Sequence, residues 1–192
     1  MNVQAHEDLK AKIWEVANRL RGPYRPPQYR LVMLPMVVLR RLDCVLELTK
    51  DVVLKKLEEL EAQQMPETAV ERLLGKAADP KRNHPLYNTS PYTFARLLGD
   101  AENIAPNLVS YINGFSQTAR SIFERFKFAD QIEKLDASNR LFAIVKAMAD
   151  IDLHPDRIDT FRSLPPDIAN DYLLDHTGHG SSSTQFGQRF RL

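Results

Sequence analysis

The feature that most constrains this chain is the apolar run LVMLPMVVL at residues 31–39. A helix that is apolar on every side must be covered by other elements over most of its surface. Nine residues are too few to cross a bilayer, which takes about 20. The run therefore predicts a covered central helix and no membrane span. Pro35 within it should kink the helix or leave one carbonyl without its helical partner.

Residues 7–22 come before this run and carry an apolar stripe at helical spacing, which Gly22-Pro23 should end. The stripe consists of Leu9, Ile13, Val16, Ala17 and Leu20. Trp14 lies beside the stripe, and packing at the edge of the core is a better interpretation of it than an anchor for a partner.

The chain after the central run is patterned for helix as well. We expect the central helix to begin near Gln28 and to become amphipathic through Gln64. Further helices are predicted over residues 66–77, 92–98, 100–116, 117–128 and 136–151. Leu, Ala, Glu, Lys and Arg dominate, and no segment alternates as a strand does. The prediction is an all-α fold, a single multi-helix domain of about seven or eight helices.

Several residues are expected to start or stop these helices. Gly75 should end the helix at 66–77, and Ser90 followed by Pro91 should start the next one. Asp136 or Ser138 should cap the last helix. These signals place the boundaries of the predicted helices.

Charge is distributed unevenly although the net charge is only +1. Residues 1–41 contain eight Lys and Arg against three Asp and Glu, and residues 43–71 contain three against eight. The first segment could face phosphates and the second could not. Ordinary solvated helix faces would give the same counts, so charge alone names no partner.

The stretch RLRGPYRPPQYR at residues 19–30 combines arginines with tyrosines around a predicted loop. Guanidinium forks and tyrosine hydroxyls near a helix start suit phosphate oxygens. The candidate phosphate-backbone contacts are Arg19, Arg21, Arg25, Arg30, Arg40 and Arg41. The alternative is a surface loop whose arginines pair with acids of a neighbouring helix, and composition does not decide between the two.

Signatures of catalysis and of metal binding are missing from the sequence. The glycines do not form a phosphate-binding loop, and no Gly-x-Ser-x-Gly elbow occurs. Asp175, His176 and His179 have metal-like spacing, but their Gly and Ser neighbours would not hold a metal rigidly. The one cysteine, Cys44, lies in an apolar run and is interpreted as a structural thiol. The absence of a signal peptide and of a disulfide pair favours a cytoplasmic location.

The segments IWEVANRLRG and YRLVMLPMVVLRRLDCVLE resemble the opening of the modification subunit of Type I restriction-modification systems. In that family a Trp-x-x-Ala-x-x-Leu-Arg-Gly helix precedes a long apolar helix. Residues 92–160 are similar to the rest of its N-terminal helical domain. The resemblance covers roughly residues 8–160, and the order and spacing of several segments agree.

This resemblance implies a helical domain that precedes an adenine-N6 DNA methyltransferase domain, which uses S-adenosylmethionine. It implies weak binding to the backbone of double-stranded DNA and contacts with a specificity subunit and a restriction subunit. The family's Pro-x-x-Gly-x-Gly loop and its (Asn/Asp)-Pro-Pro-(Tyr/Phe) motif do not occur in this chain. The stretch LPPD lacks both the acceptor before the prolines and the aromatic that stacks on a flipped adenine. No catalytic, cofactor-binding or metal residue is therefore assigned, and we expect this chain alone to be inactive and to bind no cofactor.

The chain leaves the course of the family near Thr160. Residues 1–160 are predicted to be the helical domain, and residues 161–192 a divergent tail of uncertain order. Two explanations stay open. One is a truncated or frameshifted gene, and the other is a genuine short protein with its own C-terminal segment and a helix at PPDIANDYLLDH.

Three classes of function remain for such a chain. The first is a DNA-clamping and subunit-assembly domain without the catalytic part. The second is a stand-alone protein-interaction module, in which the apolar residues of LEELEAQQMPETAVERLL pack on another helix in the same molecule or in a homodimer. An enzyme in its own right ranks last, because no nucleophile–base set is visible.

Overall fold

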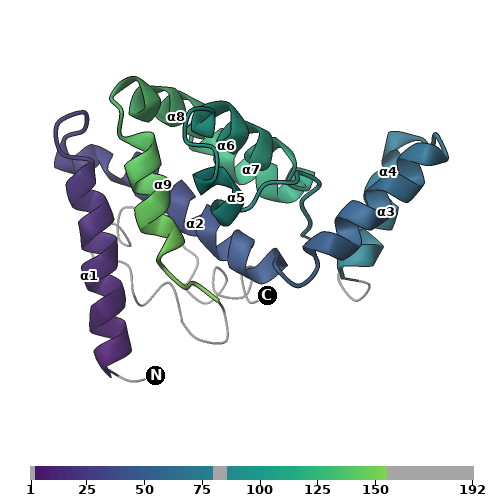
Figure 1. Ribbon diagram of the computed structural model, residues 1–192, viewed down its shortest axis with the longest axis horizontal. Helices are drawn as coiled ribbons and strands as arrows, with labels where there is room; N and C mark the ends of the chain where they lie inside the picture. Colours follow the sequence, from purple (N-terminus) through teal and green to yellow (C-terminus); the bar gives the residue numbers. More distant parts are fainter. Residues whose placement is uncertain (1–2, 80–85, 155–192) are drawn as a thin grey trace, which may run out of the picture. The chain divides into compact units, whose positions relative to one another are not determined.

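The computed structural model describes residues 3–79 and 86–154 (Figure 1). These residues form nine α-helices and one short 3-10 helix, and no named strand occurs among them. The all-α prediction is confirmed, with nine helices in the described residues where about seven or eight were expected. The described residues divide into two compact units: unit 1 contains residues 3–45 and 147–154, and unit 2 contains residues 46–79 and 86–146. The predicted boundary at residue 160 lies outside the described residues.

The higher helix count has a local cause in the middle of the chain. The helix predicted from Gln28 to Gln64 is two helices, α2 (Arg30–Leu46) and α3 (Lys50–Ala62), separated by a turn at residues 47–49. Thr49 is the residue before α3, and its hydroxyl donates back to the Leu46 carbonyl at 3.3 Å. A side chain that satisfies the last carbonyls of a helix in this way favours its end.

A second break separates α8 (Phe128–Ala137) from α9 (Leu141–Ala149). The Ser138 hydroxyl donates to the Lys134 carbonyl at 3.0 Å, and Asn139 has a φ of 54°. The Arg140 N–H then donates to the Leu135 carbonyl at 2.8 Å. This left-handed turn ends α8. The prediction that Asp136 or Ser138 starts the last helix was therefore wrong, because Ser138 closes the helix before it.

Unit 1 contains α1 (Val3–Arg19), the 3-10 helix η1 (Pro26–Gln28) and nearly all of α2. The predicted stripe of α1 is buried, and its members Ile13, Val16 and Leu20 are fully covered. The central run is covered as well, which confirms it as a core helix. Pro35 lies inside α2 and cannot donate to the carbonyl one turn earlier. Trp14 is 48% exposed, so the prediction that it packs at the edge of the core was wrong.

Unit 2 begins with α3 and α4 (Glu67–Ala78), which pack side by side (Figure 1). Their shared core consists of Val53, Leu60, Leu74 and Tyr87, with Leu57, Met65, Val70, Leu73 and Ala78 packed against it. The apolar residues of the stretch 57–74 thus pack against one another within the same molecule. Gly75 is buried inside α4 and does not end it, so that prediction was wrong.

The rest of unit 2 is built around α6 (Ile104–Asn113), which packs against α5 (Phe94–Leu98), α7 (Gln117–Arg125) and α8. A row of aromatic rings joins α6, α7 and α8, with centroid separations of 5.2, 5.8 and 6.2 Å. Its members are Tyr111, Phe115, Phe123 and Phe128. Thr93 caps α5 by accepting from the Arg96 N–H at 3.2 Å. The start predicted at Ser90 was therefore wrong by a few residues.

Candidate nucleic-acid interface

The connection between α1 and α2 is a short ordered loop at residues 20–29. Gly22 has a φ of 108°, a conformation that favours glycine. The Tyr24 N–H returns to the Leu20 carbonyl at 3.2 Å. The Arg25 N–H donates to the Gln28 side-chain oxygen at 3.0 Å, at the start of η1. The loop therefore has a defined path, which fixes the points from which its arginines extend.

The two tyrosines of this loop belong to the core of unit 1. Tyr24 is 4% exposed and Tyr29 is 9% exposed. Burial raises the pKa of the Tyr24 hydroxyl to about 12. The interpretation that these tyrosines face phosphate is corrected accordingly: their rings pack inside and anchor the loop.

The arginines of the loop differ from the tyrosines in exposure. Arg21 and Arg25 are exposed, and neither forms an ion pair with a carboxylate of the described residues. Arg19 pairs with Glu15 of its own helix at 2.6 Å, and Arg30 is half-buried at the start of α2. No Asp or Glu occurs from Val16 to Leu42. We call Arg19, Arg21, Arg25 and Arg30 the loop arginines.

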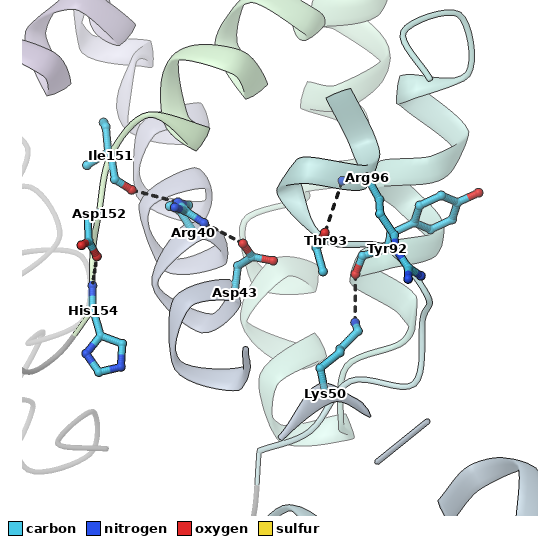
Figure 2. Close-up of polar contacts among 9 residues, drawn as sticks. All are labelled: Arg40, Asp43, Lys50, Tyr92, Thr93, Arg96, Ile151, Asp152 and His154. Carbon is cyan, nitrogen blue, oxygen red and sulfur yellow. Dashed lines mark hydrogen bonds and ion pairs between the residues drawn. The ribbon is translucent and has the colours of Figure 1, made fainter. Parts of the chain in front are cut away.

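The two remaining candidates lie further along α2 and are engaged within unit 1. Arg40 donates from Nε to the Ile151 carbonyl at 2.8 Å and pairs with Asp43 at 2.7 Å (Figure 2). Arg41 donates to the Leu153 carbonyl at 3.3 Å. The six candidates thus divide into four loop arginines and two that contact the segment after α9.

Sequence reasoning missed a buried polar group in unit 2. Lys50 is 9% exposed, and its ammonium donates to the Asn88 side-chain oxygen and to the Tyr92 carbonyl, both at 2.9 Å (Figure 2 shows the latter). Asn88 also accepts from the Ser90 N–H at 2.8 Å and donates to the Tyr111 carbonyl at 2.9 Å. A lysine among the charged residues of an amphipathic helix gives no sign of burial, since its partners lie about 40 residues away in sequence.

Other kinds of site find no support in the described part of the chain. No group of three or more His, Cys, Asp and Glu there could hold a metal ion. No helix in residues 3–79 or 86–154 is long and apolar enough to cross a membrane. Cys44 is buried as predicted, and burial raises the pKa of its thiol. The candidate pair His176 and His179 lies outside the described residues.

Comparison with known proteins agrees with the sequence resemblance. The sequence model of a family described as the HsdM N-terminal domain matches residues 9–148, well over half of the chain. No curated protein and no solved structure matches.

Proposed function

The chain belongs to the HsdM N-terminal domain family, the N-terminal region of Type I restriction-modification methyltransferase subunits, and we propose that it clamps DNA through the loop arginines and helps to assemble the parent complex. The observation that carries the DNA part is the exposure of Arg21 and Arg25 in a segment without acids. Exposed guanidinium forks without a carboxylate partner can bind phosphate oxygens without first breaking an ion pair.

Such contacts position a protein on a duplex but do not read its sequence. The loop arginines therefore predict weak binding that depends on charge and that is nearly equal for all sequences. We expect Arg40 and Arg41 to contribute less to DNA binding, because each already donates to a main-chain carbonyl.

The test is a fluorescence-anisotropy titration of a labelled random duplex between about 50 and 200 mM salt. We expect log Kobs to fall linearly with log salt, with a slope of about −0.9 for each phosphate neutralised. The double variant Arg21→Gln/Arg25→Gln should bind more weakly, and its slope should be shallower by about two such increments.

A matched control removes the same charge elsewhere. Arg72 and Lys76 are exposed cations of α4, in the acid-rich part of unit 2. Arg72→Gln/Lys76→Gln should leave the affinity and the slope nearly unchanged. Binding that ignores salt, or an equal loss in both double variants, would contradict the proposal.

The assembly part of the proposal rests on exposed apolar side chains. Trp14 on α1 is 48% exposed, and Leu48 and Val52 before and within α3 are 83% and 54% exposed. Tryptophan is among the residues that most often anchor protein contacts, and exposed apolar side chains can contribute the surrounding contact area. We propose that they contact the specificity and restriction subunits or a second copy of this chain. Trp14→Ala and Leu48→Ser should each reduce co-purification with co-expressed subunits, or dimerisation in light scattering.

A stand-alone interaction module without DNA contact is the alternative, and the salt series separates it from the clamp. Absence of binding at the lowest salt would favour the module. We further propose that this chain binds no S-adenosylmethionine, because the Pro-x-x-Gly-x-Gly loop of the family is not in the sequence. Calorimetry with the cofactor tests this, and measurable heat with a defined stoichiometry would contradict it.

A further inference from the structure

The segment that follows α9 has an unusual pattern of burial. Ile151 is 1% exposed and Leu153 is 0% exposed, whereas Asp152 and His154 between and after them are half-buried. This alternation is typical of a strand with one face on a core. No named strand occurs among the described residues, so its main-chain groups are satisfied in another way.

Three cationic side chains donate hydrogen bonds to main-chain carbonyls of this segment, as the N–H groups of a neighbouring strand would. Lys12 of α1 donates to the Asp150 carbonyl at 3.0 Å. Arg40 and Arg41 of α2 donate to the carbonyls of Ile151 and Leu153 at 2.8 and 3.3 Å. All of these residues belong to unit 1. Hydrogen bonds from charged donors are about twice as strong as neutral ones.

Arg40 is the best fixed of the three donors (Figure 2). Its side chain is 18% exposed, and its ion-pair partner Asp43, one turn further along α2, is 10% exposed. The ion pair orients the guanidinium so that Nε faces the Ile151 carbonyl. Low exposure of both partners restricts their rotamers and reduces screening by solvent.

Two further contacts complete the attachment. The His154 N–H donates to the Asp152 carboxylate at 3.0 Å, which turns the chain at the end of the segment. The Leu153 main-chain N–H lies against the Cys44 sulfur, where it counteracts part of the effect of burial on the pKa of that thiol. Cys44 is 6% exposed and is the only cysteine of the chain.

We infer that residues 150–154 form a strap that Lys12, Arg40 and Arg41 hold against α1 and α2, and that this strap opens as one cooperative segment that covers Cys44 when it is closed. Arg40 is its main positioning residue. Residues 150–154 are held in this way whether or not the loop arginines bind DNA.

The chain contains its own reporter for this strap. Opening of residues 150–154 would remove Leu153 from Cys44, so the rate at which Cys44 reacts with a thiol reagent measures opening of the strap. Local opening of this kind requires less free energy than global unfolding and has a weaker dependence on denaturant. In the wild-type chain we expect labelling of Cys44 with a shallow urea dependence at low urea.

The decisive variant is Arg40→Met, which keeps the apolar stem and removes the hydrogen bond to the Ile151 carbonyl and the ion pair with Asp43. Loss of a hydrogen bond to a charged group corresponds to an increase of about tenfold or more in the labelling rate of Cys44. Lys12→Met and Arg41→Met should give smaller increases, because the Arg40 variant also loses the ion pair that orients its guanidinium. Arg21→Met is the matched control, since Arg21 is exposed on the loop, and it should leave the rate unchanged.

Circular dichroism and urea unfolding of each variant show that the helices persist. If Arg40→Met does not fold, Lys12→Met and Arg41→Met answer the same question. Unchanged labelling in folded variants would overturn the strap. The inference would also be overturned if the labelling rate of every variant rose only in proportion to its global unfolding. Cys44 would then become exposed only when the whole core unfolds.

Discussion

The two units hold their buried or half-buried cations in different ways. In unit 1, Arg40 donates to a main-chain carbonyl of the strap and pairs with Asp43. In unit 2, Lys50 donates to one main-chain carbonyl and to the side chain of Asn88, and it lies 5.0 Å from the centroid of the Tyr111 ring. The strap of unit 1 has two further donors, Lys12 and Arg41, each to a main-chain carbonyl that is present whatever residue provides it. In unit 2, the Asn88 amide also joins the Ser90 N–H and the Tyr111 carbonyl, so the attachment there depends much more on the identity of one residue.

The strongest test of this comparison is Asn88→Ala. Asn88 is 2% exposed, and its amide joins Lys50, the Ser90 N–H and the Tyr111 carbonyl. The substitution leaves a buried ammonium and two main-chain groups without this partner. We expect the free energy of unfolding to fall by about 3–5 kcal/mol, measured by urea unfolding.

Asn113→Ala is the control for this prediction. Asn113 is exposed at the end of α6, so the change should be within about 0.5 kcal/mol. Similar losses in the two variants would mean that the polar group around Lys50 contributes little to stability.

A second test concerns the close packing around this polar group. A Cβ at Gly114 would lie 2.6 Å from the Ser90 nitrogen, 2.7 Å from the Ser90 Cβ and 3.1 Å from the Asn88 oxygen. Gly114→Ala should therefore push residues 88–90 away from α6 and cost about 2–3 kcal/mol, seen as a lower Tm. Gly99→Ala is the matched control, since its Cβ would meet only the Arg96 carbonyl at 3.3 Å and should cost less than about 1 kcal/mol.

A third test uses pH to probe the core of unit 1. The folded pKa of Tyr24 is about 12, above its usual value near 10. The unfolded chain therefore loses this proton first as pH rises, and the stability linked to Tyr24 is complete below pH 10 and is lost between about pH 10 and 12. Urea midpoints of the wild type should fall between pH 9 and 11 by more than those of Tyr24→Phe. Equal falls in the urea midpoints of both chains would show that Tyr24 ionises as easily in the folded state as in the unfolded chain.

Much of the fold followed from apolar spacing. The stripe of α1 and the covered run of α2 were predicted because a helix that buries one face or all faces must repeat its apolar residues accordingly. Trp14 was misplaced because position beside a stripe does not show whether another element covers it. The turn at Thr49 was not predicted, and Ser138 was assigned to the wrong helix, because a hydroxyl that closes a helix resembles one that starts a helix.

The candidate site was predictable to a smaller extent. The sequence pointed to all six arginines, but it could not separate the exposed Arg21 and Arg25 from Arg40 and Arg41. The partners of the latter two are main-chain carbonyls about 111 residues away, which leave no trace in side-chain pattern. The tyrosines of the same loop were assigned to the surface because their hydroxyls suit phosphate, although their rings were needed in the core.

The smallest expected effect sharpens the assignment of the loop arginines. Glu15 pairs with Arg19 at 2.6 Å, and the two side chains are 60% and 40% exposed. An exposed pair of this kind contributes about 0.2–1 kcal/mol, so Glu15→Gln should change the Tm little. The same change removes a negative charge beside the loop, and this charge repels the phosphates of bound DNA. Because the repulsion acts across water it is weak, so the affinity for duplex DNA at low salt should rise by roughly twofold.

The control is Glu7→Gln, which removes an equal charge from the pair of Glu7 with Lys10, further from the loop along α1. A larger gain from Glu15→Gln than from Glu7→Gln would place bound phosphate near Arg19, whereas equal gains would mean that the affinity follows net charge alone and would contradict a contact at the loop.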